Sequence, residues 1–191
     1  MADPFALGGK HVLITGGSSG LGRFFAETLA ARGASVTIAA RRAEALTKTV
    51  DHIGEKKGLA HSVVMDVTAS QSVEAAFDAA EARFGPVEIV VNNAGVTSTR
   101  LALEQDEASW DKVLDTNLKG VWLVAQSAGR RMVAHGIEVH RQHRFDPRIA
   151  GCRLGGSLCD FEGRGRADDQ GPGARVGASQ HSSQRTRAGV F

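Results

Sequence analysis

The sequence contains no tyrosine and only two cysteines among its 191 residues. So few cysteines exclude a disulfide scaffold. No apolar run approaches the roughly 18 residues of a membrane-spanning helix. The net charge of +2 is too small to indicate a nucleic-acid or membrane-surface partner. Because the first residues also lack a basic start followed by an apolar stretch, we expect a cytoplasmic protein without a nucleic-acid or membrane partner.

Short apolar runs alternate with longer amphipathic segments from Lys10 to about Gly136. The apolar residues of each run are consecutive, which is typical of strands buried on both faces of a parallel sheet. We therefore predict four strands, at residues 11–15, 35–40, 62–67 and 88–92. The longer segments carry apolar residues at the i, i+4 spacing of helices. These helices are predicted at residues 21–32, 43–53, 70–84 and 108–134.

This alternation predicts an α/β protein with the N-terminal half of a doubly wound, parallel-sheet Rossmann fold. We assign residues 1–138 to an incomplete nucleotide-binding domain of this type. Residues 139–191 differ in composition, because they contain nine Arg, no Lys, nine Gly and both Cys, without a sustained helix or strand period. We expect this second segment to be irregular or disordered.

A glycine-rich turn, TGGSSGLG from Thr15 to Gly22, follows the first predicted strand and opens the first predicted helix. Glycines permit a tight turn and a close approach to a pyrophosphate, while the helix N-terminus offers unpaired N–H groups. Gly and Ser clusters also occur in plain loops. The position between a strand and a helix favours a dinucleotide site over a plain loop.

Three further motifs accompany the turn: Asp66-Val67 after the third strand, Asn92 to Gly95 (NNAG) after the fourth, and Asn117 in the long helix. With these motifs, residues 8–136 resemble the short-chain dehydrogenase/reductase (SDR) family. The resemblance implies a cofactor site of the following residues: Gly16, Ser18, Ser19, Gly20, Leu21, Gly22, Arg41, Asp66, Val67, Asn93, Ala94 and Gly95.

The resemblance also implies a role for each motif. The glycines shape the phosphate turn, and the two serines bind phosphate or ribose. Asp66 accepts a hydrogen bond from the adenine amino group, and the NNAG strand end lines the ribose. Asn117 is the one catalytic residue assigned, at a helix irregularity whose carbonyl holds a water for proton transfer. Taken singly, Asp66 could be a solvated loop carboxylate, Asn93 a turn residue and Asn117 an exposed helix residue.

The end of the second strand indicates which nicotinamide cofactor is bound. An acidic residue there pairs with a ribose 2′-hydroxyl, whereas an arginine pairs with a 2′-phosphate. The sequence has Arg41 and Arg42 and no acid at this point. We therefore predict NADP rather than NAD. The alternative is that both arginines are solvated at a helix start, where the helix dipole disfavours positive charge. No metal is predicted.

The chemistry of the family uses a serine, a tyrosine and a lysine four residues after the tyrosine. This chain has no tyrosine and no lysine after Lys119. By resemblance the chain is an NADP-dependent oxidoreductase of small ketones or alcohols, which we expect to be inactive as written. The alternative is a catalytically dead, cofactor-binding relic. Family members are usually homo-oligomers, and the interface of this chain is expected to be incomplete.

Back-translation of residues 139–191, read one nucleotide later, permits the family's missing residues. A tyrosine falls over Leu158, a lysine over Glu162 and a serine over Phe145, with the family's intervals. We therefore hypothesise that the sequence from about Val139 onward is an out-of-frame translation of an SDR gene, so that the product has no function of its own.

Two other interpretations of this segment stay open. Its Arg and Gly content is compatible with a nucleic-acid-binding arm, although acidic residues such as Asp160 interrupt the positive charge. A zinc site could be sought in the four residues His140, His143, Cys152 and Cys159. Their spacing, H-x2-H-x8-C-x6-C, is not usual for zinc ligands.

Overall fold

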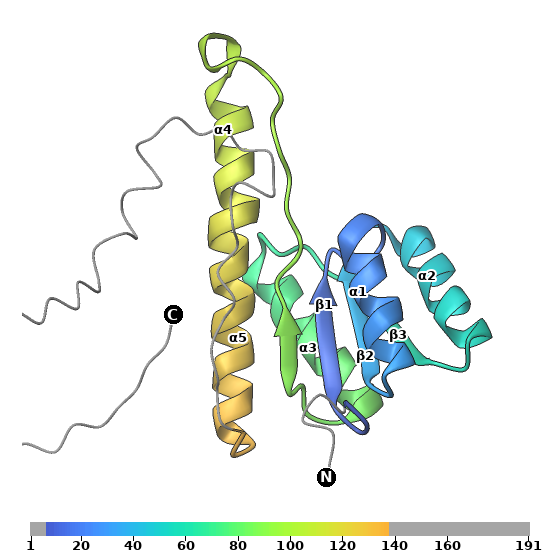
Figure 1. Cartoon of the computed structure of the whole chain (residues 1–191). Helices are drawn as coiled ribbons and strands as arrows, with labels where there is room; N and C mark the ends of the chain where they lie inside the picture. Colours follow the sequence, from blue (N-terminus) through green and yellow to red (C-terminus); the bar gives the residue numbers. More distant parts are fainter. Residues whose placement is uncertain (1–6, 138–191) are drawn as a thin grey trace, which may run out of the picture. The chain divides into compact units, whose positions relative to one another are not determined.

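The computed structural model of the chain describes residues 7–137, and the predicted irregular segment 139–191 lies outside this range. The described residues contain a four-stranded, wholly parallel sheet in the order β3-β2-β1-β4 (Figure 1). The strands are β1 (His11–Thr15), β2 (Ser35–Ala40), β3 (Leu59–Val64) and β4 (Ile89–Val91). The prediction of an α/β fold with a parallel sheet is therefore confirmed for the N-terminal part.

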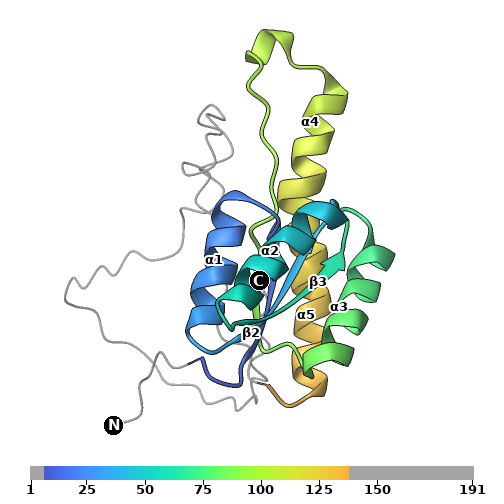
Figure 2. The same cartoon turned by 90° about the vertical axis from the view of Figure 1, so that its right-hand side faces the viewer.

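Helices cover the sheet in two layers, which the two views at right angles separate (Figures 1 and 2). One face carries α1 (Gly20–Ala31) and α2 (Ala43–Glu55). The other face carries α3 (Ser70–Phe84) and α5 (Gly120–Ala134). Between β4 and α5, the chain forms a short 3-10 turn, η1 (Ala102–Glu104), and α4 (Glu107–Leu114), which extends beyond the end of the sheet.

Strand β1 lies at the centre of the sheet because every one of its residues can be buried. Val12 and Ile14 face the core under α1 and α2, whereas Leu13 faces the core under α3 and α5. All three side chains are fully buried, and each contributes roughly 1.5–3 kcal/mol relative to an exposed position. The consecutive apolar residues in the sequence thus reflect a strand with two covered faces.

The third strand begins and ends three residues earlier than predicted, at Leu59–Val64 instead of 62–67. Its pairing with β2 runs from Ser35↔Leu59 to Ala40↔Val64, so the partner strand sets its end. The shift arises because β3 is an edge strand whose first residues are only partly buried. Partly exposed strand residues give a weak apolar pattern. The predicted range therefore followed the apolar residues up to Val67, which lie beyond the end of β3.

The predicted long helix is interrupted by one π-helical turn, η2 (Asp115–Lys119), between α4 and α5. Backbone dihedrals stay helical on both sides of the turn, so the segment is continuous. The irregularity that the resemblance implied at Asn117 is present. No helix within residues 7–137 is both long and apolar enough to cross a membrane.

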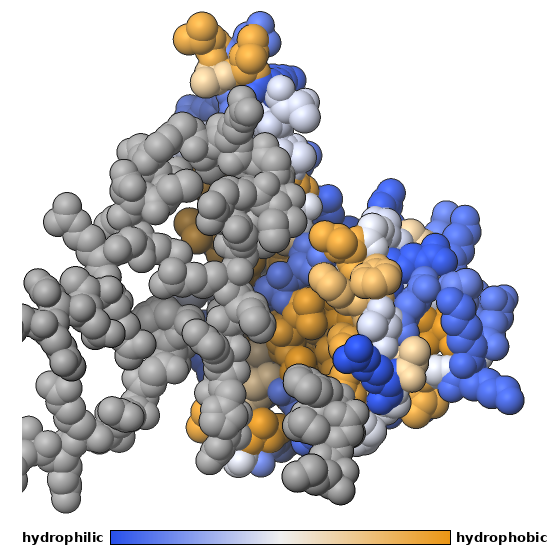
Figure 3. Space-filling view, in the orientation of Figure 1, coloured by the Kyte–Doolittle hydropathy of each residue, from blue (hydrophilic) through white to orange (hydrophobic). Residues whose placement is uncertain are grey.

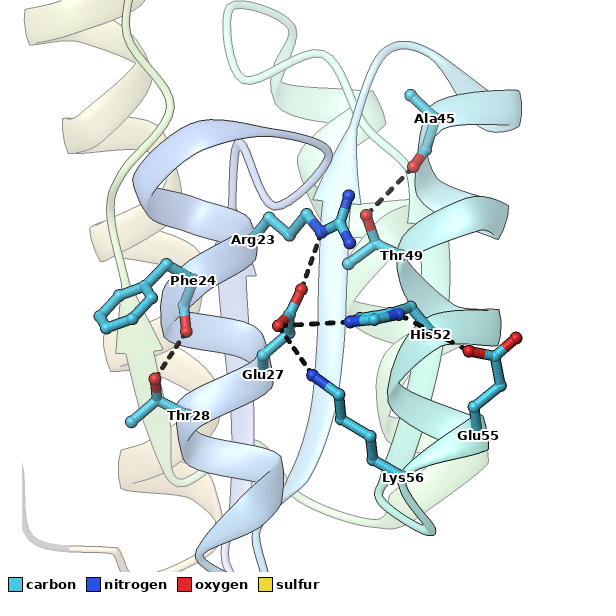
Figure 4. Close-up of polar contacts among 9 residues, drawn as sticks. All are labelled: Arg23, Phe24, Glu27, Thr28, Ala45, Thr49, His52, Glu55 and Lys56. Atoms are coloured by element: carbon cyan, nitrogen blue, oxygen red, sulfur yellow. Dashed lines mark hydrogen bonds and ion pairs between the residues drawn. The ribbon is translucent and has the colours of Figure 1, made fainter.

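A polar network joins the outer flanks of α1 and α2 (Figure 4). The Glu27 carboxylate accepts from Arg23 Nε at 2.7 Å and lies 3.4 Å from Lys56 Nζ and 3.6 Å from His52 Nε2. The hydrogen bond from Arg23 is the main cause that lowers the pKa of Glu27. The flank of α1 that faces α2 is therefore polar.

Candidate nucleotide-binding site

A cleft of about 590 Å³ opens at the carboxyl ends of the strands. It brings together nine of the predicted cofactor residues: Gly16, Ser18, Ser19, Arg41, Asp66, Val67, Asn93, Ala94 and Gly95. The other three, Gly20, Leu21 and Gly22, continue the same turn into α1. Several lining residues were not predicted: Ala39, Ala40, Arg42, Met65, Val96 and Thr116.

The glycine turn has the close packing that a phosphate cradle requires. Gly16 and Gly20 have positive φ angles of 69° and 55°, which side chains disfavour. A Cβ atom on Gly22 would lie 2.3 Å from the Gly16 carbonyl oxygen and 2.5 Å from the Asn93 Nδ2 atom. Only glycine therefore lets α1 start directly against the turn.

The N-terminus of α1 has no side-chain acceptor of its own. Ser19 is the N-cap residue, yet its side chain makes no capping hydrogen bond, and the first turn contains no acidic residue. The first N–H groups of a helix lack intrahelical partners and carry the positive end of its dipole. A turn built in this way fits an anionic group such as a pyrophosphate.

A clasp between Thr15 and Asn93 holds β1 and β4 together at the cleft. The Thr15 hydroxyl accepts hydrogen bonds from the N–H groups of Asn93 and Ala94, at 3.0 and 2.9 Å. In return, Asn93 Nδ2 donates to the carbonyls of Thr15 and Gly16, at 3.1 and 3.3 Å. The Asn93 side chain thus fixes the floor of the cleft and the glycine turn.

Asp66 is held in an ionised, oriented state at the rim of the cleft. Its Oδ1 atom accepts from the N–H and hydroxyl of Thr68, at 2.9 and 2.8 Å, and its own N–H donates to Ser72 Oγ at 2.9 Å. The Thr68 N–H bond is the main cause that lowers the pKa of Asp66, with a smaller contribution from the Arg41 charge. Among described residues no donor is bonded to Oδ2, so this oxygen can accept from an amino group.

Positive charge gathers where β2 ends. Arg41 and Arg42 both line the cleft, and Arg42 occupies the N-cap position of α2 without a capping side-chain bond. Asp66 is the only acidic residue among the lining residues. An anionic group at the end of β2 would therefore meet the side chains of two arginines.

Asn117 ties the helix irregularity to the loop that follows β4. Its Oδ1 atom accepts from the Val96 N–H and its Nδ2 atom donates to the Val96 carbonyl, both at 2.8 Å. Its neighbour Thr116 lines the cleft. The side chain therefore positions the Gly95-Val96 segment beside the cleft, an arrangement that the sequence did not predict.

Comparison with protein-family models shows to which family this chain belongs. The model of the short chain dehydrogenase matches residues 10–138. The chain belongs to the short-chain dehydrogenase family. The matched range covers all four strands and the complete cleft, so family membership and cleft rest on the same residues.

Individual short-chain dehydrogenases agree with this assignment. D-Threitol dehydrogenase of Mycolicibacterium smegmatis is 37% identical over 132 residues, which cover 69% of this chain and 51% of the relative. The 3-oxoacyl-[acyl-carrier-protein] reductase of Escherichia coli is 38% identical over 126 residues, or 65% and 50%. A solved short-chain type dehydrogenase/reductase from Mycobacterium marinum is 39% identical with a TM-score of 0.67, over 69% and 53%. The chain thus spans about half the length of these relatives.

The positions of the serine, tyrosine and lysine in the shifted frame, and those considered for zinc, fall at residues 140–162, outside the described residues. Within residues 7–137, no group of three or more His, Cys, Asp or Glu side chains could hold a metal ion.

Proposed function

We propose that the chain is the NADP-binding half of a short-chain dehydrogenase. The observation that carries this proposal is the pair Arg41 and Arg42 in a cleft whose only acidic lining residue is Asp66. A 2′-phosphate would meet two cations and no carboxylate at the end of β2, whereas a 2′-hydroxyl would lack an acceptor there. A relative supports this choice, since an actinorhodin polyketide ketoreductase solved with NADPH is 32% identical, with a TM-score of 0.64.

We assign a chemical partner in the cleft to three parts of the cofactor. The glycine turn and the N-terminus of α1 would hold the pyrophosphate, with Ser18 and Ser19 beside it. Arg41 would pair with the 2′-phosphate, and Asp66 would accept from the adenine amino group. When bound, the nicotinamide supplies hydride transfer. The carbonyl of Asn117 would hold the water that the family uses for proton transfer.

We further propose that the chain binds NADP without turning over a substrate. With no tyrosine and no lysine after Lys119, it lacks the family's proton donor and the group that activates this donor. For the whole protein we propose a cytoplasmic, homo-oligomeric reductase of a small ketone, or dehydrogenase of the matching alcohol. The names of two relatives, a 3-oxoacyl reductase and a threitol dehydrogenase, support this substrate class.

A shift of the reading frame would account for the missing catalytic residues. We propose that the encoding frame shifts near residue 139, because composition changes there and because the next frame permits the serine, tyrosine and lysine at family intervals. Sequencing the DNA through the codons for Glu138 to His140 tests this proposal. A restored frame that encodes those residues supports it, and a clean open frame without a shifted homologous reading refutes it.

Nucleotide titration tests the proposed cofactor. We expect the full-length chain to bind NADPH more tightly than NADH. Arg41→Ala should weaken NADPH about tenfold or more and leave NADH nearly unchanged, because a charged hydrogen bond contributes about 1.5–3 kcal/mol. Arg32→Ala is the matched control, since Arg32 is an exposed arginine at the end of α1. Equal affinity for both nucleotides would contradict the proposal.

Turnover is measured separately. With NADPH and a panel of 3-oxoacyl thioesters and small ketones, we expect no NADPH oxidation above that of a Gly22→Val variant, whose added side chain would collide with the turn. Oxidation clearly above this control would show that the chain is an active enzyme and would refute the catalytic part of the proposal.

A further inference from the structure

The start of α5 is in close contact with the segment that follows β3. Gly120, the first residue of α5, is buried, and a Cβ atom on it would lie 2.8 Å from Val67 Cγ2 and 3.2 Å from Val67 Cβ. The same atom would lie 3.3 Å from the Asp115 carbonyl oxygen. Carbon atoms in optimal contact are about 3.5–4.0 Å apart. Only a residue without a side chain therefore fits at this position while Val67 stays where it is.

Val67 has little freedom to move away from an added side chain. It is 9% exposed and belongs to the core that α3 and α5 share with the sheet. A branched side chain has few favourable rotamers, and rotation about its Cα–Cβ bond would leave the Cβ atom in place. The contact with position 120 would therefore be relieved mainly by a shift of the backbone at Val67.

The helix on the other side of this contact is anchored at two points. Asn117, three residues before Gly120, makes two hydrogen bonds with the backbone of Val96, both at 2.8 Å. Further along α5, the Arg131 guanidinium lies between 2.7 and 2.8 Å from three carboxylates of α3. The two helices lie side by side (Figure 2). These anchors favour movement of the Val67 segment over movement of α5.

A shift of Val67 would be passed directly to the Asp66 carboxylate. The partners of Asp66 belong to its own segment, because Oδ1 accepts from the N–H and hydroxyl of Thr68 and the Asp66 N–H donates to Ser72 Oγ. The carboxylate therefore moves together with Val67. A hydrogen bond from a ligand to Oδ2 would weaken, because such bonds depend steeply on distance and angle.

We propose that Gly120 is a positioning residue of the adenine subsite. The absence of a side chain at Gly120 lets Val67 pack against the start of α5, and this contact sets where the Asp66 carboxylate meets the adenine amino group. Gly120 is not among the described residues that line the cleft, so it acts through Val67, which does line it. The inference rests on the proposed function, in which Asp66 accepts a hydrogen bond from adenine.

A comparison of two nucleotides tests the inference. In deamino-NADPH, the hypoxanthine analogue of NADPH, an oxo group replaces the adenine amino group. We expect the full-length chain to bind NADPH about tenfold more tightly than the analogue, because hydrogen bonds to charged groups are the stronger kind. Gly120→Ala should reduce this ratio of dissociation constants to about threefold or less. General damage to the fold would weaken both nucleotides equally and would leave the ratio unchanged.

Two further variants show whether the effect passes through Val67. Gly129→Ala is the matched control in the same helix, where a Cβ atom would meet nothing within 4 Å, and it should keep the ratio. Adding Val67→Ala to Gly120→Ala removes the methyl group that the new Cβ atom would meet most closely. This double variant should recover the ratio of the unsubstituted chain.

Each outcome decides one claim. An unchanged ratio in Gly120→Ala, or a reduced ratio that Val67→Ala does not restore, overturns the inference. If circular dichroism shows that Gly120→Ala does not fold, the double variant must recover both the fold and the ratio, and its failure also overturns the inference. A ratio near one in the unsubstituted chain would instead refute Asp66 as the adenine partner in the proposed function, and the inference with it.

Discussion

At the scale of single residues, Gly22 is the position where the cleft least tolerates an added side chain. It is buried at the start of α1, and its Cα faces the Gly16 carbonyl and the Asn93 side chain. The turn, the first helix and the end of β4 meet at this point. A single added methyl group must therefore displace backbone atoms, which cannot rotate away as a flexible side chain could.

Gly22→Ala should lower the free energy of unfolding by about 1–3 kcal/mol, as overpacking does elsewhere. The matched control is Gly129→Ala in α5, where a Cβ atom would meet nothing within 4 Å. There we expect stabilisation by about 0.5–1 kcal/mol, because alanine favours the helix. Urea denaturation measures both. Equal shifts in the same direction would contradict the steric explanation.

His11 is a second residue with a large local effect, at the opposite end of β1 from the cleft. The imidazole is 2% exposed, with Nδ1 donating to the Gly85 carbonyl at 2.8 Å and Nε2 lying 2.9 Å from the Thr37 hydroxyl. Burial lowers its pKa below the ordinary 6.5, against smaller opposing effects from the Gly85 carbonyl and the carboxylates of Glu81 and Glu88. The neutral form with a proton on Nδ1 therefore suits the fold.

Stability should depend on pH through this residue. The unfolded chain takes up a proton below about pH 6.5 while folded His11 stays neutral, so stability is complete above that pH and decreases as the pH falls. Burial and the charge of Arg83 lower the pKa of His61 too, which acts in the same direction. His11→Gln should flatten the decrease in melting temperature between about pH 7 and pH 5.5. Exposed His135→Gln should leave it unchanged.

At the scale of elements, the π-helical turn connects α4 and α5 to the end of β4. Asn117 satisfies both the N–H and the carbonyl of Val96, in a segment without strand partners of its own. The Asn117 side chain and the Val96 backbone thus satisfy each other's hydrogen bonds. This pairing determines where the Gly95-Val96 segment lies beside the cleft.

Removing this pairing should loosen the loop more than the helix. Asn117→Ala leaves two backbone groups of Val96 without partners, and we expect a loss of about 1–3 kcal/mol of stability. Hydrogen exchange of the Val96 amide should accelerate accordingly. Asn92→Ala serves as a control of the same residue type, because Asn92 directly follows β4. Unchanged exchange at Val96 would argue against the assigned pairing.

The helices and strands were largely predictable from the sequence, and the errors in their predicted bounds have physical causes. Continuous apolar runs located β1 and β2, since central strands are buried on both faces. The bounds of β3 were missed because an edge strand is partly exposed and its end depends on pairing with β2. The motifs located nine of the residues that line the cleft, but they did not indicate the clasp of Thr15 with Asn93. Contacts between residues 78 positions apart leave no periodic signal.

At the scale of the whole molecule, several described elements leave apolar side chains in solvent (Figure 3). Leu59 and Val64 of β3 are 58% and 60% exposed, and Leu21 and Phe24 of α1 are 57% and 61% exposed. Exposed apolar patches of this kind promote association and reduce solubility. The full-length chain alone should therefore be prone to aggregation.

We expect the isolated chain to bind the dye ANS, to aggregate at micromolar concentration and to melt over a broad range. Phe24→Ser should increase the soluble fraction, because Phe24 is 61% exposed on α1. Leu103→Ser, at a fully exposed position in η1, should do so less. Saturating NADPH should raise stability, by about 2.7 kcal/mol at a hundredfold excess over its Kd. A monomer with a sharp melt and no dye binding would contradict these expectations.

The Thr15–Asn93 clasp has a consequence for the thermodynamics of ligand binding. Its four hydrogen bonds are made within the protein, so the cleft is already ordered before any nucleotide enters. A preorganised site loses little conformational entropy on binding. A nucleotide that entered this cleft would therefore meet a floor that does not have to fold around it, and most of the binding enthalpy would not be offset by ordering of the protein.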